Sequence, residues 1–193
     1  MKKCLLMTLA LMLISTAAFA QAPPVGYIGL FVDTEHTSWC ASGTPPYTFF
    51  IYIWCLPSEN GQMCAEFAVD YSDDPGVIPT APTPASYISV ALGSLDGGMS
   101  VCFTECQTDW HYPFSQMLFI NTPSKATVRI IEHPDIKPAP IYQFANCLED
   151  FPMEPCKVFT NVYVNSVDGV DAECSTTAAE PFSWGAIKHL MTE

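Results

Sequence analysis

Apolar and polar residues alternate along much of this chain with a period of two, which is typical of β-strands buried on one face. The clearest case runs from Met63 to Tyr71, where every second residue is apolar. The segment from Tyr47 to Cys55 is dense in aromatic and β-branched residues, as an interior strand should be. Leu56 to Gly61 joins the two segments and ends in the turn dipeptide Asn60-Gly61. The pattern therefore predicts a β-hairpin.

Further strands are predicted where short apolar runs lie between turn residues. They are Val25–Asp33, Tyr87–Leu92, Met99–Thr104, Phe114–Asn121, Ala126–Glu132, Tyr142–Asn146 and Lys157–Asn165. Glu154-Pro155 is assigned to a turn, and the proline-rich run from Ser72 to Ala85 to an extended loop or edge crossing. Seventeen prolines leave few windows for a long helix. The chain is therefore expected to be all-β, as an antiparallel sandwich or barrel.

The N-terminus has the three parts of a secretory signal peptide, residues 1–20. Lys2 and Lys3 form the positive region, Leu5 to Ile14 the apolar region, and Ala18-Phe19-Ala20 the cleavage site. The apolar run is shorter than the roughly 20 residues of a membrane span. We therefore expect cleavage near Ala20 and a secreted mature chain without a membrane span.

Eight of the nine cysteines follow this segment, and an even number in an oxidising compartment predicts a disulfide framework. They are Cys40, Cys55, Cys64, Cys102, Cys106, Cys147, Cys156 and Cys174. A zinc site is the alternative, but the chain has no Cys-x-x-Cys pair to support it. No metal or other cofactor is expected.

One disulfide can be argued from the hairpin. If the loop is centred between Glu59 and Asn60, Cys55 lies opposite Cys64, as a cross-strand disulfide requires. The other expected pairs are Cys102 and Cys106 with Cys147 and Cys156 in some order, and Cys40 with Cys174 as the remainder.

Charge limits the partners of the protein. The formal net charge is −13 and the few basic residues are scattered. Nucleic acids and anionic membranes would be repelled, because affinity for phosphate comes from clustered Lys and Arg. Binding to a protein or a polysaccharide at the cell surface is expected instead.

The composition changes after Asn165, where the predicted sandwich domain, residues 21–165, ends. Residues 166–181 are small, polar and acidic, as in a tether, and 182–193 are predicted to form a short helical tail with Ser183 as N-cap. The tail would dock through one apolar face, made of Trp184, Ile187, Leu190 and Met191.

Several short stretches carry a resemblance to a group of secreted bacterial proteins rich in cysteine. They are Trp54-Cys55-Leu56-Pro57, Cys64-Ala65-Glu66-Phe67, Cys106-Gln107-Thr108-Asp109-Trp110, Asn146-Cys147 and Ser183-Trp184-Gly185-Ala186-Ile187-Lys188. The group resembles immunoglobulin-like and cohesin-like β-sandwiches and closes with a Ser/Thr-Trp-Gly-x-Ile-Lys tail. The resemblance implies this fold and an extracellular location, but no activity.

Catalytic and metal-binding motifs are absent from the sequence. The histidines, His36, His111, His133 and His189, lack ligand spacing and are expected on surface loops. Residues 168–173 contain three acidic side chains that could offer oxygen ligands to calcium, but they lack the alternation of an EF-hand loop. A solvated acidic turn is the favoured interpretation of this segment.

Loop aromatics suggest a sharper alternative. Gln107, Asp109, Trp110 and Tyr112 could stack against and hydrogen-bond a glycan, although aromatic residues in β-proteins mostly belong to the core. The favoured prediction is a secreted, non-catalytic structural or interaction module. The alternatives are a carbohydrate-binding module and an extracellular hydrolase.

Overall fold

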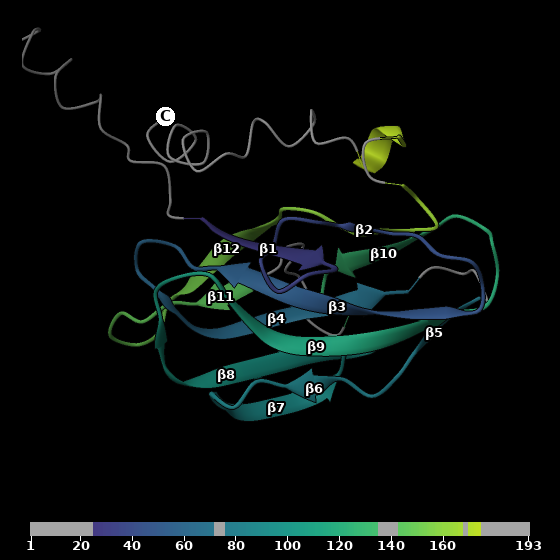
Figure 1. Ribbon diagram of the computed structural model, residues 1–193. Helices are drawn as coiled ribbons and strands as arrows, with labels where there is room; N and C mark the ends of the chain where they lie inside the picture. The colour runs from purple at the N-terminus through teal and green to yellow at the C-terminus, as the bar shows by residue number, and fades with distance from the viewer. Residues whose placement is uncertain (1–24, 72–75, 135–142, 168–169, 175–193) are drawn as a thin grey trace, which may run out of the picture.

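The structure is a computed structural model that describes residues 25–71, 76–134, 143–167 and 170–174 (Figure 1). The described part is almost entirely β-sheet, as the sequence pattern predicted. Its one helical element is the 3-10 turn Ala172–Cys174, and no helix within these residues is long and apolar enough to cross a membrane. The predicted signal peptide and the predicted helical tail with Trp184, Ile187, Leu190 and Met191 lie outside the described residues.

Thirteen strands make up the sheet structure. They are β1 (Gly26–Phe31), β2 (Cys40–Ala41), β3 (Tyr47–Leu56), β4 (Gln62–Asp70), β5 (Val77–Pro79), β6 (Thr83–Pro84), β7 (Ile88–Ser94), β8 (Gly98–Gln107), β9 (His111–Ile120), β10 (Ala126–Ile131), β11 (Gln143–Ala145), β12 (Met153–Val158) and β13 (Val162–Val164).

The strands form two packed layers. In the first layer the order is β12, β1, β3 and β9, and both β5 and β6 pair with β9. In the second layer β7 pairs with β8 and β8 pairs with β4. The other edge of β4 pairs with β10 along one half and with β11 along the other half. Strand β13 pairs with β10, and β2 pairs with β13. Strand β11 also pairs with β12, so it joins the layers at one edge.

Apolar side chains that alternate along the strands fill the space between the layers. Ile51 and Ile53 of β3 belong to the same buried cluster as Phe67 and Val69 of β4, and none of the four is more than 1% exposed. Burial of each such side chain contributes about 1.5–3 kcal/mol to folding. This cross-layer core is the reason why every second residue of these strands is apolar.

The predicted hairpin is wrong. Strand β3 pairs with β1 and β9, whereas β4 pairs with β8, β10 and β11, so the two segments lie in different layers. Residues 57–61 cross from one layer to the other instead of turning back. Alternation locates a strand and its buried face, but it contains no information on which strand lies beside it.

A buried carboxylate holds this crossing. Glu154 of β12 accepts hydrogen bonds from the Ser58 hydroxyl at 2.5 Å and from the side-chain amides of Asn60 and Asn146 at 2.7 and 2.6 Å. Burial raises the pKa of Glu154, but the three hydrogen bonds stabilise the carboxylate and bring its pKa below the ordinary value. Gly61 ends the crossing with φ at +71°, where a Cβ would also overlap a neighbouring disulfide sulfur.

Two strand pairs are parallel, which corrects the prediction of a wholly antiparallel sandwich. They are β1 with β12 and β13 with β2. The predicted strand Lys157–Asn165 is also two strands, because the chain stays hydrogen-bonded to β1 as far as Thr160 and then pairs with β10 in the second layer. Glu154-Pro155 belongs to β12 and not to a turn.

Three disulfides are present: Cys40–Cys174, Cys64–Cys102 and Cys106–Cys147. The Cys40–Cys174 disulfide confirms the pair that was expected as the remainder. The expected Cys55–Cys64 disulfide is wrong because Cys55 points into the core and is 0% exposed, whereas Cys64 lies on the outer surface of the other layer. There it faces Cys102 of the adjacent strand, so the expected bond from Cys102 to Cys147 or Cys156 is wrong as well.

Cys55 and Cys156 remain as buried thiols. Strand β1 lies between their strands, with Ile28 opposite Cys55 and Gly26 opposite Cys156. Strands that are separated by a third strand are roughly 10 Å apart, which exceeds the roughly 7 Å that a disulfide spans between Cα atoms. Burial raises the pKa of the Cys55 thiol to about 12, so it is inert near neutral pH.

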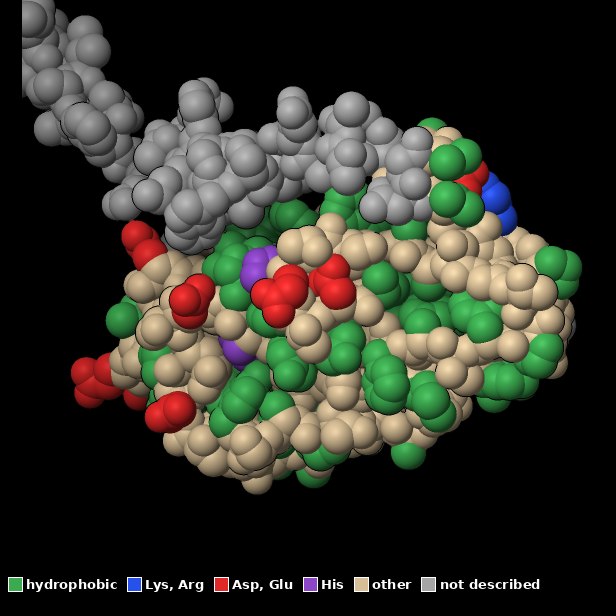
Figure 2. All heavy atoms as spheres, viewed as in Figure 1, with side chains coloured by type: hydrophobic (Ala, Val, Ile, Leu, Met, Phe, Trp, Pro, Cys, Tyr) green, Lys and Arg blue, Asp and Glu red, His purple; other side chains and the backbone are tan. Residues whose placement is uncertain are grey.

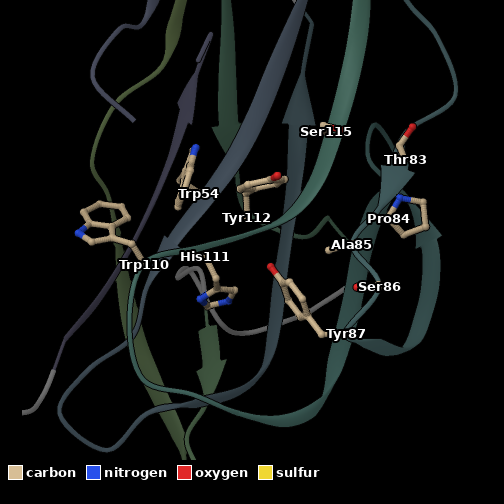
Figure 3. Close-up of a pocket in the computed structure, with 10 residues that line it drawn as sticks. All are labelled: Trp54, Thr83, Pro84, Ala85, Ser86, Tyr87, Trp110, His111, Tyr112 and Ser115. Atoms are coloured by element: carbon tan, nitrogen blue, oxygen red, sulfur yellow. The ribbon is translucent and has the colours of Figure 1, made fainter. Parts of the chain in front are cut away.

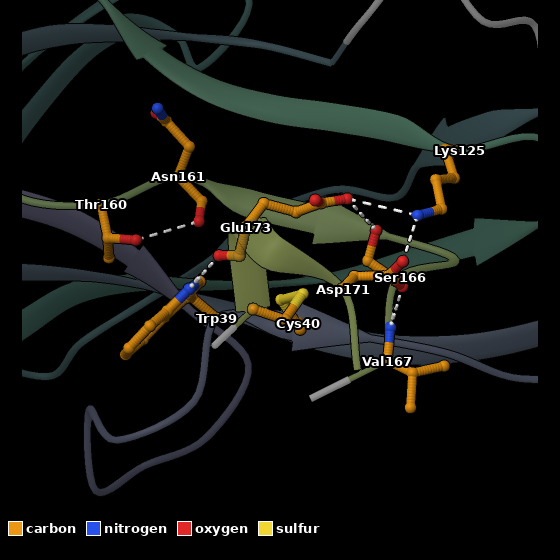
Figure 4. Close-up of a disulfide and its surroundings, with 10 residues drawn as sticks. Trp39, Cys40, Lys125, Thr160, Asn161, Ser166, Val167, Asp171 and Glu173 are labelled. Carbon is orange, nitrogen blue, oxygen red and sulfur yellow. Dashed lines mark hydrogen bonds and ion pairs between the residues drawn. A yellow bond between two sulfur atoms is a disulfide. The ribbon is translucent and has the colours of Figure 1, made fainter. Parts of the chain in front are cut away.

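The first part of the predicted tether is fixed to the sandwich (Figure 4). The Trp39 indole N–H donates to the Glu173 carbonyl at 3.0 Å, close to the Cys40–Cys174 disulfide. Lys125 forms ion pairs with Asp171 at 2.5 Å and with Glu173 at 3.4 Å. These two carboxylates, which were considered as calcium ligands, are thus paired with a lysine.

Candidate functional site

The outer surface of the first layer carries exposed apolar side chains. We call this surface the aromatic face and define it by Phe50 and Tyr52 of β3, Met117 and Phe119 of β9, and Ile78 of β5. The register places Phe50 beside Met117 and Ile78 beside Phe119. Phe50 is 47% exposed and Ile78 is 45% exposed. The outer face of a two-layer sandwich is normally polar, so this surface requires an explanation other than the core.

No charged side chain belongs to the aromatic face. Figure 2 shows hydrophobic side chains spread over the surface above β3, β9 and β5, whereas most acidic side chains visible in this view lie to the left. This segregation is notable in a chain with a formal net charge of −13. An uncharged apolar patch on an acidic protein is typical of a contact surface.

Aromatic rings continue from this face toward a pocket. The ring centroids of Phe50 and Tyr52 are 6.4 Å apart, those of Tyr52 and Tyr112 are 5.3 Å apart, and those of Tyr112 and Trp54 are 5.0 Å apart. The Tyr52–Tyr112 and Tyr112–Trp54 contacts are edge-to-face, and each adds about 0.5–1.5 kcal/mol beyond the buried area. The series therefore fixes the orientation of the rings that border the pocket.

His36 and Trp110 close the far end of the series. The two rings stack with centroids 4.6 Å apart, and His36 also lies 4.7 Å from Trp54. Burial lowers the pKa of His36, although the carboxylates of Asp33 and Glu35 oppose this shift. A neutral His36 ring is suited to stacking on an indole.

The pocket itself has a volume of about 490 Å³ and lies between residues 83–87 and the start of β9 (Figure 3). Trp54, Trp110 and Tyr112 form an aromatic side, and the segment with Pro84, Ser86 and Tyr87 lies opposite. Ten residues line the pocket: Trp54, Thr83, Pro84, Ala85, Ser86, Tyr87, Trp110, His111, Tyr112 and Ser115. None of them has a carboxylate, an ammonium or a guanidinium group.

Two polar atoms at the base of the pocket lack a partner within the described protein. His111 Nδ1 is 3.0 Å from the Asp109 carbonyl, so we assign the proton to Nδ1, which leaves Nε2 as an acceptor. Nε2 and the Tyr87 hydroxyl are both buried, and no described protein group hydrogen-bonds to either. Burial lowers the pKa of His111 to about 4, so the ring is neutral near pH 7. An unmatched buried polar group costs about 1–3 kcal/mol.

The structure divides the four residues that were predicted to contact a glycan. Trp110 and Tyr112 line the pocket, but Gln107 and Asp109 do not. The Gln107 amide donates to the Glu105 carbonyl at 3.0 Å, and Asp109 accepts the Trp110 backbone N–H at 2.7 Å. Both polar side chains therefore serve the loop itself.

The candidate histidines lie in different surroundings. His111 is buried at the start of β9, which corrects its assignment to a surface loop, whereas His36 lies in the loop after β1, half-buried against aromatic rings, and His133 follows β10. His189 lies outside the described residues. In the part of the chain that the structure describes, no group of three His, Cys, Asp or Glu could hold a metal ion.

Sequence reasoning missed the segment that closes the pocket, residues 83–87. It lies within a proline-rich run that has no period of two, and β6 spans only Thr83–Pro84. Nothing in the sequence showed that this run returns to pair with β9. His111 was also missed, because it was taken for a loop residue although it begins β9 and lies opposite Cys55.

Comparison with solved structures supports the fold. A cohesin module of a family 33 glycoside hydrolase from Clostridium perfringens matches with a TM-score of 0.52 and 11% identity, over 74% of this chain and 98% of that one. The sixth cohesin of scaffoldin B from Acetivibrio cellulolyticus, in complex with a dockerin, matches with a TM-score of 0.51 and 18% identity, over 74% and 99%. A cohesin–dockerin complex from Clostridium thermocellum gives 0.51 and 9%, over 77% and 99%.

The chain therefore has a cohesin-like β-sandwich fold. No family model matches its sequence, and no curated protein sequence matches it either. At these identities the likeness concerns the fold alone, so a function has to be argued from the site.

Proposed function

We propose that the protein is an exported, non-catalytic interaction module whose aromatic face binds another protein. The exposed, uncharged apolar surface of β3, β9 and β5 carries this proposal. Such a surface loses little on desolvation, because it contains no charge to bury. Cohesins with a similar fold are seen in complex with dockerins, which shows that this architecture supports protein binding.

The acidic charge of the chain defines the kind of partner. The partner should present apolar side chains toward Phe50 and Ile78 and should be neutral or basic around them. Complementary charge accelerates association, whereas like charge prevents it. The apolar aromatic face and the acidic charge of the chain would thus both favour a partner that is apolar at its centre and neutral or basic around it.

Export completes the proposal. The signal-like residues 1–20 and the three disulfides are both consistent with an oxidising compartment. Recovery of the protein from outside the cells, with an N-terminus near Gln21, is the expected result of N-terminal sequencing. A full-length reduced protein in the cytoplasm would contradict this part of the proposal.

The binding test compares matched surface variants. Phe50→Ser and Ile78→Ser alter the aromatic face, whereas Val90→Ser alters an apolar side chain on β7 of the other layer that is 48% exposed. In quantitative affinity capture from surface and medium fractions of the source organism, a specific partner should be retained at least about tenfold less by the first two variants. Equal retention by all three variants would overturn the assignment of the aromatic face.

A further inference from the structure

We propose that the pocket between residues 83–87 and Trp54, Trp110 and Tyr112 binds a hexose ring of a neutral polysaccharide. This site adjoins the aromatic face but differs from it in shape and chemistry. The inference goes beyond the proposed protein-binding function and does not depend on it.

The shape of the pocket suits a single sugar ring. Its volume of about 490 Å³ is within the usual range for small-ligand sites. Trp110 and Tyr112 are half-buried, so their rings are fixed yet reachable from outside. A pyranose presents a face of C–H groups that can pack on such rings, while its hydroxyls extend from the ring edge.

The polar groups around the pocket match hydroxyls. His111 Nε2 offers an acceptor and the Tyr87 hydroxyl a donor, and neither is used by the described protein. His111 is 7% exposed, and both rings face the space at the centre of the lining residues (Figure 3). Thr83, Ser86 and Ser115 add hydroxyl groups to the lining.

Charge around the pocket favours a neutral sugar. The lining has no cation that could pair with a uronate or a sulfate. The nearest charges identified at its aromatic end are acidic, since Asp33, Glu35 and Asp109 all act on His36. An anionic sugar would be repelled there, whereas a neutral hexose would not.

The experiment measures oligosaccharide binding by the oxidised full chain. Cellohexaose, maltohexaose and mannohexaose are titrated up to millimolar concentrations, with hexagalacturonic acid as the anionic comparison. Calorimetry and the fluorescence of the pocket tryptophans report binding. We expect saturable binding of at least one neutral oligomer and none of the anionic oligomer.

Two variants assign the binding to the pocket. Tyr87→Phe removes one hydroxyl and should weaken affinity about fivefold, as expected for one hydrogen bond. Trp110→Leu removes part of the aromatic side and should weaken affinity at least about tenfold. Tyr163→Phe on β13 removes a hydroxyl elsewhere and should leave affinity unchanged.

The outcomes separate this inference from the protein-binding proposal. No saturable binding of any neutral oligomer to the wild-type chain would overturn the inference, and so would equal binding by wild type, Tyr87→Phe and Trp110→Leu. Ile78→Ser, which lies outside the ring series that borders the pocket, should keep the sugar affinity of the wild type. Loss of protein capture in that variant, together with intact sugar binding, is the result expected if both proposals hold.

Discussion

The two outer surfaces of the sandwich differ in what holds them and in what they expose. On the first layer, Phe50 and Ile78 are open to solvent and no charge accompanies them. On the second layer, β4 and β8 are joined by Cys64–Cys102, and next to it Ser100 donates to Glu66 at 3.2 Å. The outer surface of the second layer is cross-linked and mixes polar side chains with exposed apolar ones such as Leu92, whereas the aromatic face carries no charge.

This difference indicates a division of tasks between the layers. A disulfide between neighbouring strands restrains the second layer without using its apolar residues. The first layer places large rings outside the core. Its stability comes from the other side of the same strands, where Ile51 and Ile53 are fully buried.

Removal of the Cys64–Cys102 disulfide should destabilise the protein more than any of the single substitutions below. The bond joins residues that are 38 positions apart. Closing a loop of this length lowers the entropy of the unfolded chain, so the double variant Cys64→Ala/Cys102→Ala should lose about 4 kcal/mol of unfolding free energy. Urea titration of the oxidised protein checks this value. A loss below about 1 kcal/mol would show that the second layer does not depend on its cross-link.

The layer crossing gives the next largest effect. Glu154→Gln replaces an acceptor of three hydrogen bonds with an amide that brings its own donors, and should cost about 2 kcal/mol at pH 7. Because the pKa of Glu154 is lowered in the folded state, its stabilisation is present above the unfolded pKa and is lost as the pH falls through the folded pKa. The variant and the wild type should therefore converge in stability under acid.

Urea titrations at neutral and at acidic pH test this expectation. The control is Glu66→Gln, which makes the same substitution on the outer surface of β4. Gln116→Glu would not serve, because it adds a charge to the core. Glu66→Gln should change stability by no more than about 0.5 kcal/mol. An equal loss in both variants would show that burial of the Glu154 carboxylate is not what holds the crossing.

Much of the secondary structure was predictable because it follows from the periodicity of apolar residues along the chain. Met63 to Tyr71 alternates, and β4 spans Gln62–Asp70 with Phe67 and Val69 inward. Pairing was not predictable, because it depends on contacts between distant segments. The linker 57–61 has turn chemistry, and both a hairpin and a crossing satisfy that chemistry.

The disulfide error has the same origin. Cys55 was expected opposite Cys64 in a hairpin, but Cys55 faces the core from one layer and Cys64 lies on the outer side of the other. The candidate site shows a similar limit. Trp110 and Tyr112 could be nominated from their chemistry, whereas the opposite wall around Tyr87 depends on a return of the chain that no pattern predicts.

Substitution on the aromatic face should affect stability less than either change above. Phe50→Ser removes a side chain that is 47% exposed, so the expected loss is about 1 kcal/mol. Thermal unfolding of the variant beside wild type measures it. A loss of several kcal/mol would mean that Phe50 supports the fold and would remove the basis for treating this surface as free to bind.

The ion pair on the second layer should give the smallest effect. Arg129 Nη2 of β10 lies 2.9 Å from Asp70 Oδ2 of β4, but the two side chains are 55% and 32% exposed. Solvent and salt screen such a pair, so Arg129→Ala should cost about 0.5 kcal/mol at low ionic strength and less in high salt. Denaturant titrations at two salt concentrations check both values. A larger loss that salt weakens would show that charges hold the second layer as well as its disulfide, and the two layers would then differ in electrostatics and not only in covalent restraint. A larger, salt-independent loss would show that Arg129 acts by packing and not by its charge.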